Sequence, residues 1–171
     1  MVRHVVLLGP MGVGKTVIGS AIAESLGRPV FDSDRRLEAS GGDTGQVIAA
    51  KIGVDGLHQH EHGFLRDAIN STGPAVIAAA ASCADDRDLL NTVVAAGHAL
   101  VFLDAANIDL TQLARGASHR RPVPESEAIR LHSRRRATAE AAGALVFTPR
   151  RFSDPEQAAS ALLDELSLLD R

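Results

Sequence analysis

Residues 9–16 read Gly-Pro-Met-Gly-Val-Gly-Lys-Thr, which matches the G-x-x-x-x-G-K-[ST] pattern of a phosphate-binding loop. Gly12 and Gly14 allow the backbone to wind tightly, so that successive N–H groups point inward at a phosphate. Lys15 can reach the β- and γ-phosphate oxygens of a nucleotide, and the Thr16 hydroxyl can coordinate Mg²⁺. The motif therefore predicts a nucleotide site. Because it is not G-x-G-x-x-G, it disfavours a dinucleotide-binding fold.

The residues on either side of this loop support the same prediction. An apolar run at residues 4–8 is typical of a short buried strand, and apolar side chains recur at helical spacing over residues 17–26. Strand, glycine-rich loop and helix form the context in which the pattern binds phosphate, whereas a chance glycine-rich turn would lack it. The residues expected to contact the nucleotide here are Gly12, Val13, Gly14, Lys15, Thr16 and Val17.

Two acidic residues, Asp32 and Asp34, follow the short apolar run at residues 29–31, which predicts a second strand. Ligands of a parallel α/β sheet gather beyond the carboxyl ends of its strands, so both acids are expected near the phosphate loop. One of them can hold Mg²⁺ while the other accepts the proton of an acceptor hydroxyl. The alternative is an ordinary acidic turn that caps a helix over residues 35–39.

A basic segment, Ser118-His119-Arg120-Arg121-Pro122, interrupts the regular pattern of the chain. An arginine in this segment could close over a triphosphate and stabilise the charge that spreads over a transferring phosphoryl group. We therefore predict a lid loop near residues 115–124. A solvated basic loop without a catalytic role is the alternative.

The composition favours one soluble domain of 171 residues with a core built from Ala, Val, Leu and Ile, because aromatic residues make up only 3% of the chain. The formal net charge of −3 argues against nucleic acid as a partner. Cys83 is the single cysteine, and the chain has no apolar run of membrane-spanning length. We expect a cytoplasmic protein, without a leader peptide or membrane contact, that is monomeric.

Apolar runs and helical patterns alternate to the end of the chain, which predicts an α/β fold with a parallel sheet covered on both faces. We expect one kinase-sized domain over residues 1–171, with a helical region near residues 35–72 on the acceptor side. The predicted strands are residues 4–8, 29–31, 76–81, 100–103 and 145–147. The predicted helices are residues 17–26, 35–39, 44–52, 54–70, 85–96, 125–142 and a last one opened by Ser153-Asp154-Pro155-Glu156, with a further helix starting over 108–113.

Several of these segments, taken in order, resemble the shikimate kinase family of P-loop kinases. They are the phosphate loop, Phe31-Asp32-Ser33-Asp34, Val76-Ile77, Val101-Phe102-Leu103, Arg121-Pro122 and the arginines before Ala142-Gly143-Ala144. The resemblance implies a three-layer P-loop fold with a five-stranded parallel sheet. It also implies ATP with Mg²⁺ and phosphorylation of a small hydroxylated metabolite.

The same resemblance implies roles for individual residues. Asp34 matches the family's acceptor-binding acid and Asp32 its magnesium-associated acid. Arg121 matches the lid arginine better than Arg120 does. Arg136, or alternatively Arg135, matches the arginine that grips the acceptor's carboxylate, and Arg115 and Arg150 match positions that line the adenine.

Two segments on the acceptor side depart from the family pattern. Ala79-Ala80-Ala81 stands where the family has three glycines, so three Cβ atoms narrow the pocket and make a positive φ costly. His58 stands where the family has a second carboxylate-gripping arginine, although Glu61 matches a family acid. A histidine lacks the planar two-pronged fork of an arginine and is mostly neutral at pH 7. We expect the three alanines and His58 near the acceptor.

The segment His58-Gln59-His60-Glu61-His62 also fits the H-x-x-E-H pattern of one metallopeptidase class, but no third metal ligand is evident in the sequence. The arginines at 134–136 could equally form a solvated helix face. Cys83 is expected to be a small core residue, and Gly63 is expected to mark a kink or a close approach in its helix.

These observations predict an ATP-dependent kinase for a hydroxyl of a small metabolite, and they make shikimate itself doubtful as the acceptor. A nucleotide-binding sensor or interaction protein with little kinase activity is an alternative from another class. A kinase for a sugar acid or a nucleoside monophosphate is the third hypothesis.

Overall fold

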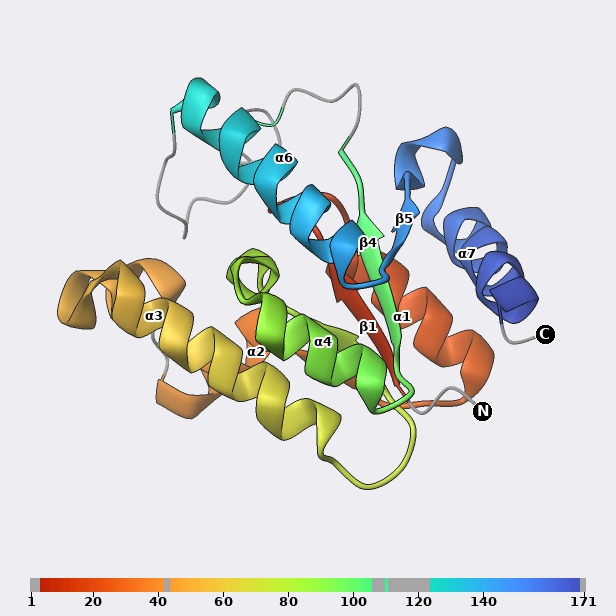
Figure 1. Cartoon of the computed structure of the whole chain (residues 1–171). Helices are drawn as coiled ribbons and strands as arrows, with labels where there is room; N and C mark the ends of the chain where they lie inside the picture. The colour runs from red at the N-terminus through yellow and green to blue at the C-terminus, as the bar shows by residue number, and fades with distance from the viewer. Residues whose placement is uncertain (1–3, 42–43, 106–109, 111–123, 170–171) are drawn as a thin grey trace.

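A computed structural model describes residues 4–41, 44–105, 110 and 124–169 of the chain. The centre of the molecule is a sheet of five parallel strands in the order β2-β3-β1-β4-β5 (Figure 1). The strands are β1 (Val5–Leu8), β2 (Val30–Asp32), β3 (Val76–Ala78), β4 (Ala99–Leu103) and β5 (Leu145–Phe147). The predicted parallel sheet and the five-stranded P-loop architecture are confirmed.

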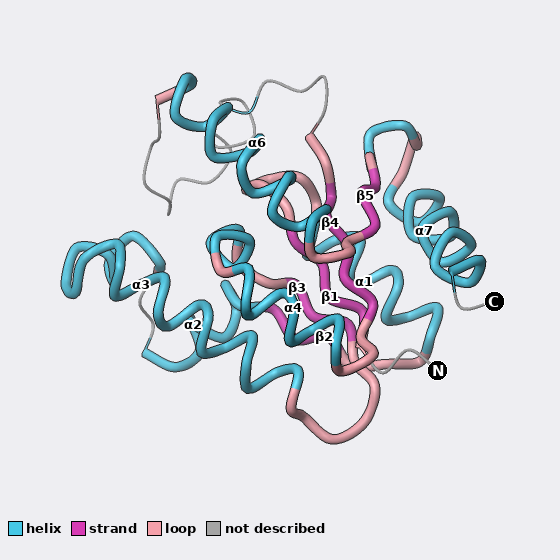
Figure 2. Tube along the Cα trace, in the orientation of Figure 1, coloured by secondary structure: helices cyan, strands magenta, loops and turns pink. Residues whose placement is uncertain are grey.

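Helices cover both faces of this sheet (Figure 2). The face toward the viewer packs against α3 (Gly45–Ile69), α4 (Arg87–Ala95) and α6 (Glu125–Ala141), and the other face packs against α1 (Lys15–Leu26) and α7 (Pro155–Leu169). Two short elements, α2 (Ser33–Gly41) and the 3₁₀ helix η1 (Ala81–Asp85), lie at the carboxyl end of the sheet, and η2 (Pro149–Arg151) follows β5. Within the described residues every helix is too short or too polar to span a lipid bilayer.

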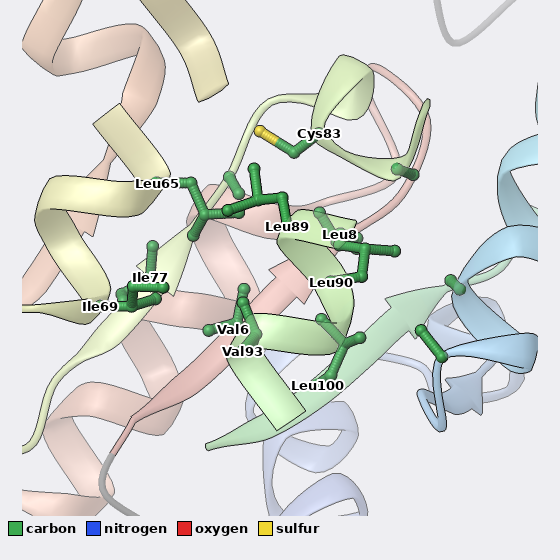
Figure 3. Close-up of a cluster of buried hydrophobic side chains, with 14 of the residues drawn as sticks. Val6, Leu8, Leu65, Ile69, Ile77, Cys83, Leu89, Leu90, Val93 and Leu100 are labelled. Carbon is green, nitrogen blue, oxygen red and sulfur yellow. The ribbon is translucent and has the colours of Figure 1, made fainter. Parts of the chain in front are cut away.

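Each face of the sheet carries its own hydrophobic cluster. β1 is buried along its whole length, as expected of a central parallel strand covered on both faces. Val6 and Leu8 point into the cluster under α3 and α4 (Figure 3), whereas Val5 and Leu7 point into the cluster under α1 and α7. Cys83 lies at the edge of the first cluster and is buried, as predicted.

The region predicted to be two helices, 44–52 and 54–70, is confirmed as a kinked pair within α3. The Thr44 hydroxyl accepts a hydrogen bond from the backbone N–H of Val47 and so caps the first part. Gly53 has φ 81° and ψ 166°, which interrupts the helix between the two parts. The kink therefore lies at Gly53 and not at Gly63, whose added Cβ would meet no atom within 4 Å.

Two further predicted elements have other boundaries in the structure, and a third falls outside the described residues. The strand predicted over residues 76–81 ends at Ala78, because η1 begins at Ala81 and turns the chain away from the sheet. The next helix begins at Arg87 and not at 85, since the Asp86 side chain caps it by accepting from Leu89 N–H at 2.9 Å. The helix predicted to start over residues 108–113 lies, except for Leu110, outside the described residues.

Candidate active site

A cavity of about 680 Å³ opens beside the phosphate loop, beyond the carboxyl ends of β2 and β3. Its walls come from the start of α1, from α2, from both parts of α3, from η1 and from α6. The charged and titratable side chains of its wall are Lys15, Asp32, Asp34, Glu38, His58, Glu61, Asp85, Glu127, Arg134 and Arg135. This position agrees with the rule that open α/β sheets bind ligands outside the carboxyl ends of their strands.

The phosphate loop has the conformation that its glycines predict. Gly12 and Gly14 have φ of 75° and 105°, values that side chains with a Cβ rarely adopt. Gly9 is required for a different reason: a Cβ on it would lie 2.5 Å from the carbonyl oxygen of Leu103 at the end of β4. The Nζ of Lys15 donates to the carbonyl oxygens of Gly9 and Pro10, at 2.8 and 3.0 Å, and lines the cavity.

Thr16 and Asp32 are brought together from two elements that are distant in sequence. The Thr16 hydroxyl at the start of α1 donates to Asp32 Oδ2 at the end of β2, over 2.7 Å. The other oxygen of Asp32 accepts from the backbone N–H groups of Asp34 and Arg35, at 3.0 and 3.2 Å. Asp32 therefore also caps α2, as expected of an acidic turn that caps a helix. A hydroxyl and a carboxylate are hard oxygen donors of the kind that Mg²⁺ prefers, so the pair fits this ion.

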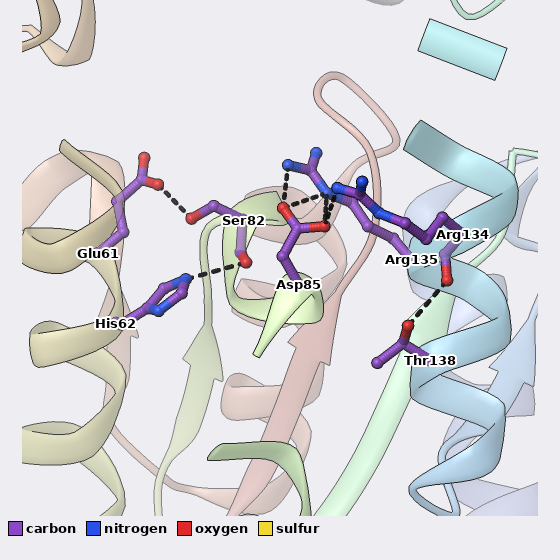
Figure 4. Close-up of polar contacts among 7 residues, drawn as sticks. All are labelled: Glu61, His62, Ser82, Asp85, Arg134, Arg135 and Thr138. Carbon is purple, nitrogen blue, oxygen red and sulfur yellow. Dashed lines mark hydrogen bonds and ion pairs between the residues drawn. The ribbon is translucent and has the colours of Figure 1, made fainter. Parts of the chain in front are cut away.

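Asp34, His58 and Glu61 line the wall formed by α2 and α3. The Glu61 carboxylate accepts a hydrogen bond from the Ser82 hydroxyl on η1 (Figure 4). Burial raises the pKa of Glu61 above its usual value, and the charge of Asp34 raises it further. The Ser82 hydrogen bond and the nearby His58 only partly offset this. Glu61 is thus a carboxyl whose ionised form is poorly compensated by the surrounding protein.

The histidine pattern on α3 does not assemble a metal site. The rings of His58 and His62 stack with their centroids 6.4 Å apart, but His62 Nε2 donates to the Ser82 carbonyl at 3.0 Å and its Nδ1 lies 3.5 Å from Asp86. Among the described residues, no group of three or more His, Cys, Asp or Glu side chains could hold a metal ion. His58 faces the cavity, and His62 faces η1.

Of the three alanines, Ala80 and Ala81 line the cavity, whereas Ala79 is fully buried and does not. Ala80 has φ −62° and ψ 150°, an extended conformation that any residue adopts without strain. The expected cost of a positive φ therefore does not arise at Ala80. The methyl groups of Ala80 and Ala81 form part of the cavity wall.

An ion pair between η1 and α6 forms the opposite wall (Figure 4). Nε and Nη2 of Arg135 both donate to Asp85, with Nη2 at 2.6 Å from Oδ2, and Nη2 of Arg134 donates to Asp85 Oδ1 at 2.7 Å. Burial would raise the pKa of Asp85, but the hydrogen bonds from Arg135 and Arg134 outweigh it and hold the pKa below the usual value. Both guanidinium groups are therefore engaged by one carboxylate of the protein.

Comparison with known proteins identifies the family. Residues 11–167 match the family model described as shikimate kinase. A shikimate kinase of Streptomyces avermitilis is 32% identical over 182 aligned positions, which cover 98% of this chain and 97% of that protein. This chain belongs to the shikimate kinase family. It is therefore an ATP-dependent P-loop kinase of small molecules with an alcohol group as acceptor.

Solved structures support the fold of this family member. A shikimate kinase from Bacteroides thetaiotaomicron superposes with a TM-score of 0.80 at 23% identity, covering 96% of this chain and 98% of that one. A shikimate kinase from Acinetobacter baumannii, determined in complex with shikimate, gives a TM-score of 0.79 at 24% identity and covers 100% of this chain and 96% of the other. At these identities the likeness establishes the architecture.

Two arginines that the sequence assigned to the ligands lie away from the cavity of this kinase. Arg136 is not part of its wall; Nη1 of Arg136 lies 3.2 Å from Asp104, and Nη2 lies 3.5 Å from Glu140. Arg135, the alternative, lines the cavity instead, because successive residues of a helix point about 100° apart. Arg150, on η2, is exposed and is not part of the wall.

The predicted lid falls outside the described residues. Arg115, Arg120 and Arg121 lie outside the described residues, as does the whole segment 111–123. Among the predicted nucleotide contacts, Gly12, Gly14, Lys15, Thr16 and Val17 line the cavity. Val13 is buried beneath the loop, in the cluster under α1.

Sequence reasoning missed Ser82 and Asp85 as parts of this site. Their only signal was indirect: a segment that leaves the sheet after β3 must pass the carboxyl end where ligands bind. It also missed the buried contact between Asp104 and His132, whose Nε2 lies 2.8 Å from Asp104 Oδ1. Asp104 thus joins the end of β4 to α6 through both His132 and Arg136.

Proposed function

We propose that this kinase transfers the γ-phosphoryl group of Mg²⁺·ATP to a hydroxyl of a small metabolite other than shikimate, one that bears no carboxylate. The observation that carries the proposal is that Asp85 engages the two arginines which line the cavity within the described residues. His58 adds to it, because an imidazole cannot replace a guanidinium fork as a carboxylate partner.

The nucleotide half of the site is assigned to the phosphate loop. Lys15 and the loop N–H groups bind the β- and γ-phosphates, with the partial positive charge of the α1 N-terminus behind them. Thr16 and Asp32 are the residues that would hold Mg²⁺, and that ion would neutralise charge on the phosphate oxygens. Arg115 and Arg150 remain proposed neighbours of the adenine.

The acceptor half is assigned to the wall formed by α2 and α3. Asp34 orients the acceptor hydroxyl and can take its proton as the phosphoryl group is transferred. We assign Arg121 to the lid, where its guanidinium would stabilise the developing charge. Catalysis in this class rests mainly on positioning and on electrostatic stabilisation, so each group acts by where it is held.

The first test is ATP consumption by the purified protein with Mg²⁺ and a panel of acceptors that includes shikimate, polyols, amino alcohols, sugar acids and nucleotides. We expect acceptor-dependent turnover of about 1–100 per second with at least one compound that lacks a carboxylate. Rapid turnover of shikimate would overturn the acceptor proposal. ATP binding without turnover of any acceptor would instead favour the nucleotide-binding sensor.

The second test is Lys15→Ala, with Lys51→Ala as its control. Loss of a preorganised phosphate-binding charge should lower kcat by about 10²–10³-fold while leaving the fold intact, because the Nζ of Lys15 donates to carbonyl oxygens of the loop itself, at Gly9 and Pro10. Lys51 is exposed and outside the cavity wall, so its removal should leave kcat unchanged. Full ATP turnover by Lys15→Ala would show that the loop does not perform the chemistry.

A further inference from the structure

We propose that the acceptor of this kinase is cationic: a polyhydroxylated amine, such as an amino polyol or amino sugar, whose ammonium group is bound by Glu61. This inference rests on the proposed kinase function and names the chemical class of its acceptor. Glu61 would act as a specificity-determining residue, and the phosphoryl transfer itself would stay at Asp34.

The charges along the described cavity wall favour such a ligand. Its acids are Asp32, Asp34, Glu38, Glu61, Asp85 and Glu127, whereas its permanently charged cations are Lys15, Arg134 and Arg135. Lys15 belongs to the phosphate loop, and both arginines are engaged by Asp85. The described acceptor side therefore offers a ligand more negative than positive charge, which attracts cations and repels anions.

Glu61 is the carboxylate best placed to receive an ammonium group. Its carboxylate accepts a hydrogen bond from the Ser82 hydroxyl, and no described arginine or lysine forms an ion pair with it. It lies close enough to Asp34 and His58 for their charges to act on it. A half-buried carboxylate without a cationic partner is costly, and an ammonium ion from the ligand would supply the missing charge. The closeness of Asp34 places this ammonium near the hydroxyl to be phosphorylated.

A carboxylated acceptor would meet two obstacles in the same cavity. To reach a guanidinium it would have to displace Asp85 from Arg135, and the side chains of these two residues are only 20% and 16% exposed. It would also stand near Glu61 and Asp34, whose charges would repel it. Partly buried ion pairs with several hydrogen bonds are costly to break, so the acidic wall selects against anions.

Matched acceptors test the charge directly, since glucamine, glucitol and gluconate differ only at the first carbon, which is an aminomethyl, hydroxymethyl or carboxylate group. A cyclic set of an aminocyclitol, inositol and shikimate repeats the comparison. We expect kcat/KM to fall at least tenfold from the amine to the neutral compound, and again to the acid. A preference for either acid would overturn the inference while leaving the kinase function in place.

Binding provides a readout that does not depend on turnover. With Mg²⁺·ADP present, the amines should raise Tm and bind by calorimetry more tightly than their neutral and acidic counterparts. If no compound were phosphorylated and yet the amines bound selectively, the proposed kinase function would fail while the cationic site stood. Equal or tighter binding of the acids would overturn the cationic site.

Variants assign the selectivity to residues. Glu61→Gln should lower kcat/KM for the amine about 10–100-fold with little change for the acid, and Asp55→Asn, exposed on the same helix, is its control. Asp85→Asn should release the arginines and raise kcat/KM for the acid about tenfold, with the exposed Asp88→Asn as control. An equal loss for all acceptors in Glu61→Gln would show a merely structural role and overturn the assignment.

Discussion

Asp32 accepts hydrogen bonds with both of its carboxylate oxygens, one from a partner's side chain and the other from backbone N–H groups. Oδ2 accepts from the Thr16 hydroxyl, and Oδ1 accepts from two N–H groups at the start of α2. Oδ2 belongs to the proposed magnesium site, where the ion requires a negative charge, whereas the cap of α2 requires only an acceptor atom. The two tasks can therefore be separated by substitution.

We predict that Asp32→Asn raises the Mg²⁺ concentration for half-maximal activity at least tenfold while leaving Tm within a few degrees of the wild type. The amide oxygen still accepts the N–H groups of α2, but the charge is gone. Asp32→Ala loses the cap as well and should cost a further ~1 kcal/mol of unfolding free energy. Magnesium titrations and thermal melts check both, and an unchanged magnesium dependence in Asp32→Asn would contradict the assignment.

The raised pKa of Glu61 predicts whether the stability of the protein rises or falls with pH. Its pKa in the folded protein is raised, chiefly by burial. The protonated form, which the folded protein favours, is therefore lost as the pH rises through that raised pKa. The wild type should therefore lose stability, relative to Glu61→Gln, as the pH rises above about 4.5 and through that raised pKa.

Thermal melts of both proteins from pH 4 to pH 8 test this expectation. The glutamine keeps an oxygen that can accept the Ser82 hydroxyl, so the comparison isolates the charge. Glu24→Gln, an exposed change on α1, should follow the wild type at every pH. Melting curves of Glu61→Gln that run parallel to those of the wild type would show that Glu61 ionises without cost.

At the scale of elements, α3 forms much of the cavity wall that we assign to the acceptor. Its first part carries Gly45, Gln46 and Ala49 into the cavity wall, and its second part carries Val54, Leu57, His58 and Glu61 there. The angle between the two parts is set at Gly53. Its φ of 81° with ψ of 166° belongs to a region that is essentially restricted to glycine.

We predict opposite effects for two glycine-to-alanine changes in this helix. Gly53→Ala should lower the unfolding free energy by about 1–3 kcal/mol and raise KM for the acceptor, because the kink would be strained. Gly63→Ala has open space for its Cβ in a regular helix and should stabilise the protein by up to ~1 kcal/mol. Urea unfolding and acceptor kinetics measure both, and equal effects would contradict this account of the kink.

For the molecule as a whole, the two hydrophobic clusters support different faces of the sheet. The cluster under α3, α4 and α6 supports the elements that form the cavity, whereas the cluster under α1 and α7 lies on the other face of the sheet. Leu162 on α7 is fully buried in the second cluster. A change there should affect stability without reaching the acceptor wall.

We predict that Leu162→Ala costs about 2–5 kcal/mol of unfolding free energy, while KM for the acceptor stays unchanged. Leu163, its partly buried neighbour, should cost less when changed in the same way. Urea unfolding gives the free energies, and steady-state kinetics on the folded fraction give KM. A large rise in KM would show that the two faces of the sheet are coupled.

The sheet could be predicted from the sequence, because buried parallel strands appear as apolar runs between helical patterns. The position of the site could be predicted as well, because the glycine-rich loop marks it. The sequence was not sufficient after β3, where four consecutive alanines carry neither a β-branched signal nor a periodic one. The run fits a strand, a turn or a helix equally well, and the chain in fact leaves the sheet at Ala78.

The arginines that line the cavity could not be chosen from sequence for a related reason. Arg134, Arg135 and Arg136 form an uninterrupted polar run, so no apolar periodicity sets the rotation of α6. The partner that selects among them, Asp85, lies about fifty residues earlier in the chain. Pairings over such separations follow from the packing of α6 against η1, which local propensity does not encode.

Cys83 gives this architecture a built-in reporter. Its Sγ lies 3.6 Å from the Glu61 carbonyl on α3, the residue is fully buried, and burial raises the pKa of the thiol. As the single cysteine of the chain, it can react with a thiol reagent only when α3 separates from η1. The labelling rate therefore measures how often the acceptor wall opens, and an acceptor that bridges Glu61 and Asp34 should slow it.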